Sequence, residues 1–156
     1  MSNEEILKQC LEQEAKYQFD SISHEDVWRL GHILVELGNA QEKPVAVEVQ
    51  VNGLTMFSFY PDGTSPYYQY VLKKKHTTVN LMNKSSLRFW AENQISGLDP
   101  EKDMFLDGTK MQFRGGAFPI RLKGGCVVGS IAVSGMAHTD DHALIITALE
   151  KFFDEK

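Results

Sequence analysis

Two histidines stand four residues apart, with two aspartates between them, in the stretch SGMAHTDDHALI of residues 134–145. Imidazoles at positions i and i+4 can share a metal ion when both lie on one face of a helix. Thr139, however, is the best N-cap here, and Asp140 and Asp141 suit the positive end of a helix dipole. His138 would then precede the helix, and the pair would lose the geometry of a chelate. The stretch predicts a helix start and no protein-built metal site.

Nucleophilic and acid–base catalysis find little support in the residues. Ser130 and Ser134 fit strand alternation or a strand end, and no G-x-S-x-G elbow surrounds a serine. Cys126 begins a predicted strand beside two valines, which predicts a buried, inert thiol. Glu48 falls on the exposed side of a predicted strand and has no carboxylate partner. The sequence therefore predicts no catalytic residue.

The composition predicts one domain over residues 1–156, because 156 residues with 42% hydrophobic and 24% charged residues suit a single core. The net charge of −5 disfavours a nucleic-acid partner. No apolar run approaches the roughly 20 residues of a membrane span, and the acidic N-terminus does not resemble a signal peptide. We expect a cytosolic protein with two reduced cysteines and no membrane partner.

The apolar periodicity predicts helices and two hairpins. Alternating valines, then Asn52-Gly53, then LTMFSFY predict the first hairpin. Pro119 predicts that one strand of the second hairpin lies at a sheet edge. The predicted helices cover 4–19, 24–38 behind a capping box of Ser23 and Asp26, 66–83, a short segment after Ser85 or Ser86, and 140–153. The predicted strands cover 45–51, 54–60, 110–113, 118–122 and 126–134.

This order of elements predicts an α+β domain, with N-terminal helices within 4–41 and the sheet with its other helices within 44–153. We expect an antiparallel sheet of four or five strands with helices on both faces.

Two longer stretches point to a family. GGAFPIRLKGGCVVGSIAVSG, followed by an aspartate-rich helix start, and DGTSPYYQYVLKKKHTTVNLMNKSS carry the pattern. The chain resembles the GlcG/HbpS-like haem-degrading domain family, and the second stretch is similar to an intracellular, UPF-type branch of it. The resemblance covers most of residues 44–153. It implies a profilin-like sandwich, assembly into dimers or higher rings and, in some members, binding of haem or another small molecule.

The glycines of the first stretch allow two interpretations. They could serve only to turn the backbone into a strand. Alternatively, they form a concave backbone nest that receives an anion or a carboxylated ligand, with an arginine at its side. The predicted ligand-binding residues are Arg114, Gly115, Gly116, Phe118, Pro119, Lys74 and Lys75.

Haem would need one axial side-chain donor, and two histidines are candidates. His76 follows three lysines that could meet haem propionates, and His138 lies in the loop where the resemblance implies a pocket. The competing interpretation makes His76 a solvated helix residue and His138 a loop residue without a special role. The sequence leaves both open.

Three functions follow. The first is a non-enzymatic, homo-oligomeric module that binds a small molecule or a partner protein. The second is a haem-binding or haem-degrading protein, and the third is a structural or chaperone-cofactor ring subunit whose acidic termini recruit another protein. An exposed sheet edge and the aromatic run Tyr67, Tyr68 and Tyr70 favour an oligomer, although packing within one chain would also explain them.

Overall fold

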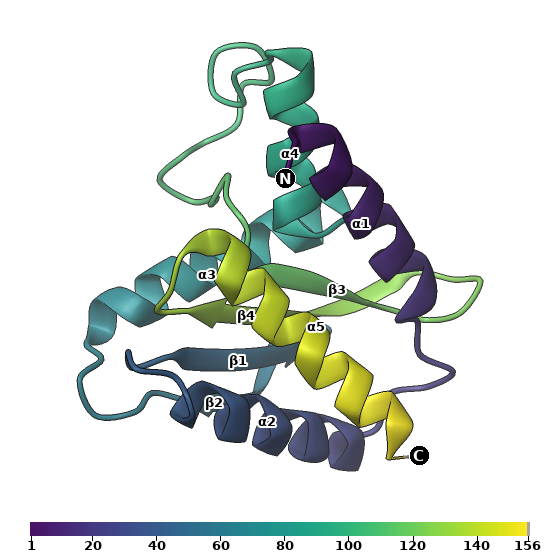
Figure 1. The fold of residues 1–156 in the computed structure, drawn as a ribbon, viewed down its shortest axis with the longest axis vertical. Helices are drawn as coiled ribbons and strands as arrows, with labels where there is room; N and C mark the ends of the chain where they lie inside the picture. The colour runs from purple at the N-terminus through teal and green to yellow at the C-terminus, as the bar shows by residue number, and fades with distance from the viewer. Residues whose placement is uncertain (156) are drawn as a thin grey trace.

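The computed structural model describes residues 1–155 and shows one antiparallel sheet with helices on both faces (Figure 1). Within these residues five helices and four strands follow one another. They are α1 Asn3–Lys16, α2 His24–Asn39, β1 Ala46–Val51, β2 Leu54–Phe59, α3 Pro66–Met82, α4 Ser86–Ser96, β3 Ala117–Arg121, β4 Val127–Ser134 and α5 His138–Asp154. The predicted α+β class is confirmed, with four strands. None of these helices is long and apolar enough to traverse a bilayer.

The local signals act as predicted at the ends of most elements. Ser23 Oγ accepts from the Asp26 N–H at 3.0 Å, and the Asp26 carboxylate accepts from the Ser23 N–H at 2.9 Å, which completes the capping box. Asn52 and Gly53 have φ angles of 52° and 80°, the left-handed values that a two-residue hairpin turn requires. Pro66 occupies the first turn of α3. These three predictions are confirmed.

The strands are ordered β2-β1-β4-β3, and every neighbouring pair is antiparallel. Pro119 therefore lies on an edge strand, as predicted. In the centre of the sheet Val47 faces Val133 across the strands, and Glu48 faces Ala132. Successive residues of β1 point to opposite faces of the sheet, so Val47 and Glu48 meet different helices.

Each face of the sheet has its own helical cover. In Figure 1, α5 crosses in front of the sheet with α2 beside it, and α3 lies behind it. The front layer holds the larger core, which includes Val47, Val49, Phe118, Ile131 and Phe152. The rear layer holds a smaller cluster, in which alanines of three strands let α3 come close: Ala46, Ala117, Ala132, Leu72 and Val79. Helices α1 and α4 pack on each other at the end of the sheet beside β3.

The predicted strand at 110–113 is wrong. The N–H of Gln112 donates to Thr78 Oγ1 at 3.1 Å, and the Thr78 hydroxyl donates to the Gln112 carbonyl oxygen at 2.7 Å. The N–H also lies 3.3 Å from the carbonyl oxygen of Lys74. The backbone of this segment is thus held by α3 and does not join the sheet.

Two further predictions need correction. Helix α5 begins at His138, because the N–H groups of Asp140 and Asp141 both donate to the carbonyl oxygen of Ala137, which is the N-cap. Cys126 is exposed and not buried, because it belongs to the turn before β4. Both cysteines of the described chain are free thiols.

Candidate functional site

A lysine and an aspartate are buried together where α3, the end of β4 and the start of α5 meet. Lys75 is 3% exposed and Asp141 is 2% exposed. The ammonium of Lys75 donates to Asp141 Oδ2 at 3.0 Å and to the carbonyl oxygen of Val133 at 2.6 Å. Asp141 Oδ1 accepts from the N–H of Met136 at 3.0 Å. The pair therefore fastens the loop between β4 and α5 to α3.

Gly116 makes room for this lysine. Its φ is +121°, and a Cβ at this position would lie 2.4 Å from Lys75 Nζ and 2.9 Å from the Val133 carbonyl oxygen. Only glycine meets both the backbone angle and the space. Burial lowers the pKa of Lys75 and raises that of Asp141, and each charge offsets part of the shift of the other. A run of three lysines is expected on the solvated side of a helix, but Lys75 points inward.

A second buried polar cluster lies between α3 and the sheet. His76 Nε2 donates to Glu48 Oε1 at 3.0 Å, and His76 Nδ1 lies 2.6 Å from Ser130 Oγ. The hydroxyl of Tyr60 donates to the other oxygen of Glu48. Burial opposes ionisation of Glu48, but hydrogen bonds from His76 and Tyr60 outweigh it and hold the pKa of Glu48 below its usual range. The cluster links β1, β4 and α3 through satisfied hydrogen bonds.

This cluster overturns two expectations. His76 is 2% exposed and Glu48 is 5% exposed, so neither is a solvated surface residue. Both faces of β1 are covered, and the face that carries Glu48 is the one under α3. Ser130, His76 and Glu48 resemble a nucleophile, base and orienting acid in kind, but Ser130 is fully buried. A substrate therefore has no path to the serine in this structure.

Arg114 and His138 lie together at the surface next to the buried lysine. Burial, and then the charges of Arg114 and Lys75, lower the pKa of His138. The N–H of Gly115 donates to His138 Nδ1 at 2.9 Å, so the neutral ring carries its proton on Nε2. The ring of Trp90 meets that of His138 edge-on, with centroids 4.9 Å apart. Arg114 is exposed, and its guanidinium makes no hydrogen bond or ion pair with any residue in 1–155.

The first turn of α5 adds unpaired donors to this surface. Ala137, its N-cap, supplies no side-chain hydrogen bond, so the N–H groups of His138 and Thr139 lack the usual cap, while those of Asp140 and Asp141 donate to the Ala137 carbonyl oxygen. The N-terminus of a helix carries a partial positive charge that favours anions. Exposed Asp140 in the same turn offsets part of this charge. We call Arg114, His138, Trp90 and the first turn of α5 the arginine surface.

The remaining predicted ligand residues have different surroundings. Phe118 and Pro119 are buried in β3, and the Phe118 ring lies 5.9 Å from that of His142 in the core. Lys74 is half-buried, with its ammonium 5.3 Å from the Tyr70 ring centroid. The structure thus brings together Arg114, Gly115, Gly116, Lys75 and His138. Ligand binding by the predicted set stays a prediction.

Trp90 and Asp141 are the residues at the arginine surface that the sequence did not single out as site residues. Asp141 was interpreted only as a residue that complements the helix dipole, although it pairs with a lysine 66 residues earlier in the chain. A buried lysine needs a partner, so recognition of Lys75 as an inward residue would have prompted a search for one.

Residues 22–150 match the sequence profile of a family described as haem degrading protein HbpS-like. The chain belongs to this family. Among the relatives of this HbpS-like chain, a UPF0303 protein of Streptomyces avermitilis is 34% identical, over 90% of this chain and 86% of its own length. A UPF0303 protein of Azotobacter vinelandii is 33% identical, over 100% of this chain and 94% of its own. The predicted family membership is confirmed.

Solved structures share the HbpS-like fold. The crystal structure of the Ybr137w protein matches with a TM-score of 0.86 and 23% identity, over 96% of this chain and 88% of that chain. A complex of PduOC with haem matches with a TM-score of 0.70 and 19% identity, over 83% and 94%. A double mutant of Streptomyces reticuli HbpS matches with a TM-score of 0.67 and 20% identity, over 86% and 88%. These likenesses concern the fold.

The second histidine of the HTDDH stretch is buried against α1. His142 Nε2 lies 2.7 Å from Gln13 Oε1, which can only accept, so Nε2 carries the ring proton. His138 and His142 therefore face different partners. Among residues 1–155 no three His, Cys, Asp or Glu side chains are grouped to hold a metal ion.

His142 is expected to make stability depend on pH. Burial, and then the charge of His138, lower the pKa of His142 to about 4 from 6.5. The unfolded chain binds this proton below about pH 6.5, but the folded protein does not until about pH 4, so stability falls as the pH drops between these values. The contribution is about 1.4 kcal/mol per pH unit. Urea unfolding across this range should show a slope that His142→Phe reduces, and an equal slope in both proteins would contradict this.

Proposed function

We propose that this HbpS-like protein is a cytosolic, homo-oligomeric and non-catalytic module that binds a carboxylated small molecule at the arginine surface. The observation that carries the proposal is the free guanidinium of Arg114 beside the uncapped first turn of α5. Arginine binds carboxylates through two parallel hydrogen bonds, and unpaired helix N–H groups favour the same charge.

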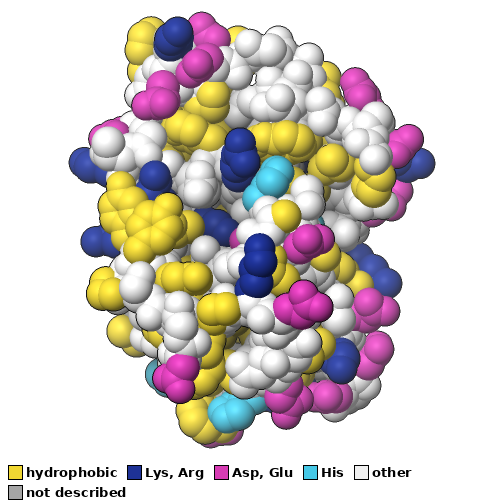
Figure 2. Space-filling model, turned by 60° about the vertical axis from the view of Figure 1, so that its left-hand side comes forward, with side chains coloured by type: hydrophobic (Ala, Val, Ile, Leu, Met, Phe, Trp, Pro, Cys, Tyr) yellow, Lys and Arg dark blue, Asp and Glu magenta, His cyan; other side chains and the backbone are white. Residues whose placement is uncertain are grey.

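The surroundings of Arg114 support an anionic ligand with an aromatic or apolar body. Figure 2 looks onto the side of the molecule that lies at the left in Figure 1, where lysine or arginine side chains, a histidine and acidic side chains lie around a hollow near the centre. Hydrophobic side chains form a patch beside it. The ring of Trp90, packed edge-on against His138, offers an apolar contact at the same surface.

Haem is the first ligand to test, because the family is described as haem degrading and PduOC, a protein of the same fold, was solved with haem. The propionates carry the negative charge that the arginine surface would bind. Iron ligation by the predicted histidines does not fit, because both ring nitrogens of His76 have buried partners and His138 carries its proton on Nε2. Haem would therefore bind through its two carboxylates and not through its iron.

We assign no catalysis to this protein because the side chains that could act as catalysts are buried away from any substrate. The groups with the character of a nucleophile and a base, Ser130 and His76, are enclosed between α3 and the sheet. Lys75 is committed to Asp141 and a backbone carbonyl group. These residues stabilise the fold. The ligand would meet the exposed arginine surface, which offers groups for binding and none for catalysis.

The edge strand β2 supports assembly. It pairs only with β1 in the described sheet, and Leu54 and Phe59 at its two ends are 60% and 38% exposed. On the neighbouring helix Trp28 is 60% exposed. An open edge with exposed apolar side chains invites pairing with a second copy. Light scattering during gel filtration tests this: one defined multimer is expected, and a monomer at all concentrations would contradict it.

Substitution of Arg114 tests the ligand site. Arg114→Glu is expected to weaken binding of protoporphyrin IX at least about tenfold, because a charge-assisted pair worth about 1.5–3 kcal/mol is replaced by repulsion. Lys151→Glu is the matched control, since it makes the same charge change in the last turn of α5. Fluorescence titration gives both affinities. Equal weakening by the two variants would indicate a general charge effect and contradict the assigned site.

A further inference from the structure

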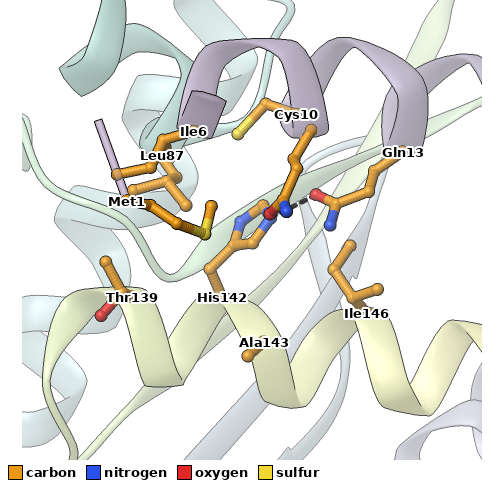
Figure 3. A pocket seen from close by; sticks show the side chains of 10 residues that line it. Met1, Ile6, Cys10, Gln13, Leu87, Thr139, His142, Ala143 and Ile146 are labelled. Carbon is orange, nitrogen blue, oxygen red and sulfur yellow. Dashed lines mark hydrogen bonds between the residues drawn. The ribbon is translucent and has the colours of Figure 1, made fainter. Parts of the chain in front are cut away.

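A cavity of about 510 Å³ lies between α1 and α5, next to the first turn of α4. In Figure 3 the ring of His142 rises from α5 toward the side chains of Cys10 and Gln13, which descend from α1. Cavities that hold small molecules in proteins have volumes of about 300–1,000 Å³. The remaining lining residues are Met1, Ile6, Gln9, Leu87, Thr139, Ala143 and Ile146.

His142 lines this cavity and carries an unsatisfied hydrogen-bond acceptor that neighbouring side chains cover. Its side chain is buried, with 4% of the residue exposed. Nε2 donates to Gln13, which leaves a lone pair on Nδ1, and no donor among the described residues reaches that atom. Buried polar atoms in native proteins almost always have a partner, so a molecule in the cavity that displaces the covering side chains would supply the donor that this nitrogen lacks.

The other lining residues define the chemistry of that donor. No lysine, arginine, aspartate or glutamate lines the cavity. Burial, first among several causes, raises the pKa of Cys10 to about 12, so its thiol is uncharged. Most of the lining is apolar, with the glutamine amides and the Thr139 hydroxyl as neutral polar groups. A cavity of this kind binds an uncharged molecule.

We propose that the cavity between α1 and α5 is a binding site for a small, uncharged, mainly apolar molecule that donates one hydrogen bond, from a hydroxyl or a ring N–H, to Nδ1 of His142. This site is separate from the arginine surface and takes the opposite class of ligand. A carboxylate is disfavoured, because its oxygens would face the lone pair of Nδ1 and no lysine or arginine side chain lines the cavity. The proposal therefore does not depend on the carboxylate function assigned to Arg114.

Matched pairs of probes test the role of the donor. Phenol donates a hydrogen bond and anisole does not, and indole and N-methylindole form a second pair of similar shape. A net hydrogen bond corresponds to about a fivefold to tenfold gain in affinity, so phenol and indole should bind more tightly than their methylated partners by this factor. Titration followed by the ¹⁵N resonance of Nδ1 reports on the atom itself, which should shift with phenol and not with anisole.

Two variants keep the test decisive. His142→Phe removes the acceptor and retains an aromatic ring beside Phe118, so the preference for phenol over anisole should disappear. Ala143→Trp fills the cavity from its exposed side, leaves His142 in place and should abolish binding of all four probes. The proposal is overturned if phenol and anisole bind equally, if the preference survives in His142→Phe, or if no probe binds and the cavity holds only water.

Discussion

Replacement of Asp141 by alanine is expected to lower the free energy of unfolding by about 3–5 kcal/mol, because it leaves the buried ammonium of Lys75 without its counter-ion. The two residues are 2% and 3% exposed, so solvent cannot replace the lost partner. The Lys75 ammonium would also be left with the carbonyl oxygen of Val133 as its one remaining hydrogen-bond partner. Urea unfolding at neutral pH measures the loss.

A double substitution distinguishes the cost of an unpaired buried charge from the cost of losing the ion pair. Lys75→Met with Asp141→Leu removes both charges and keeps similar volumes, and buried ion pairs replaced in this way often lose little stability. The double variant should therefore be markedly more stable than Asp141→Ala. If the double variant were as unstable as the single one, the geometry of the loop between β4 and α5, and not the unpaired charge, would explain the effect.

His76 is expected to behave as a structural residue. His76→Leu should cost about 3–5 kcal/mol, because the substitution leaves Glu48 ionised and buried with the Tyr60 hydroxyl as its remaining partner. The pKa of Glu48 should rise in the variant, since the hydrogen bond from His76 helps to hold it low. Thermal and urea unfolding give the loss of stability.

His138→Leu is the matched control for this substitution. His138 is half-buried and accepts one hydrogen bond, from the N–H of Gly115, so about 1 kcal/mol is the expected loss. Similar losses in the two variants would contradict the assignment of His76 to the buried cluster. A large loss of stability in His138→Leu and a small one in His76→Leu would make His138, and not His76, the structural histidine.

Elements with local signals could be predicted from the sequence. The capping box of Ser23 and Asp26, the turn at Asn52-Gly53 and the edge position of Pro119 each depend on residues adjacent in the chain. The segment 110–113 has the sequence pattern of a strand, and nothing local shows that its backbone pairs with Thr78 of α3. Periodicity indicates which residues share a face but does not show what covers that face.

Periodicity was equally silent about what covers the polar side chains of the candidate site. The alternation in β1 correctly separates Glu48 from Val47, but the polar side is covered by α3 and not by water. In α3, residues 72, 75, 76 and 79 follow the i, i+3, i+4, i+7 pattern of one helix face, so Lys75 and His76 had to point inward with Leu72 and Val79. The run of three lysines concealed this signal.

The central claim is recognition of a carboxylate at Arg114. It is tested most directly by titrating the protein separately with protoporphyrin IX, hemin and protoporphyrin dimethyl ester. Gel filtration with light scattering then gives the mass of each complex. Hemin and protoporphyrin should bind one defined oligomer with similar affinity, because the iron is not needed, and the ester should bind at least about tenfold more weakly, because it has no carboxylates. Binding of hemin alone, equal binding of the ester, or no binding of either acid would contradict the account.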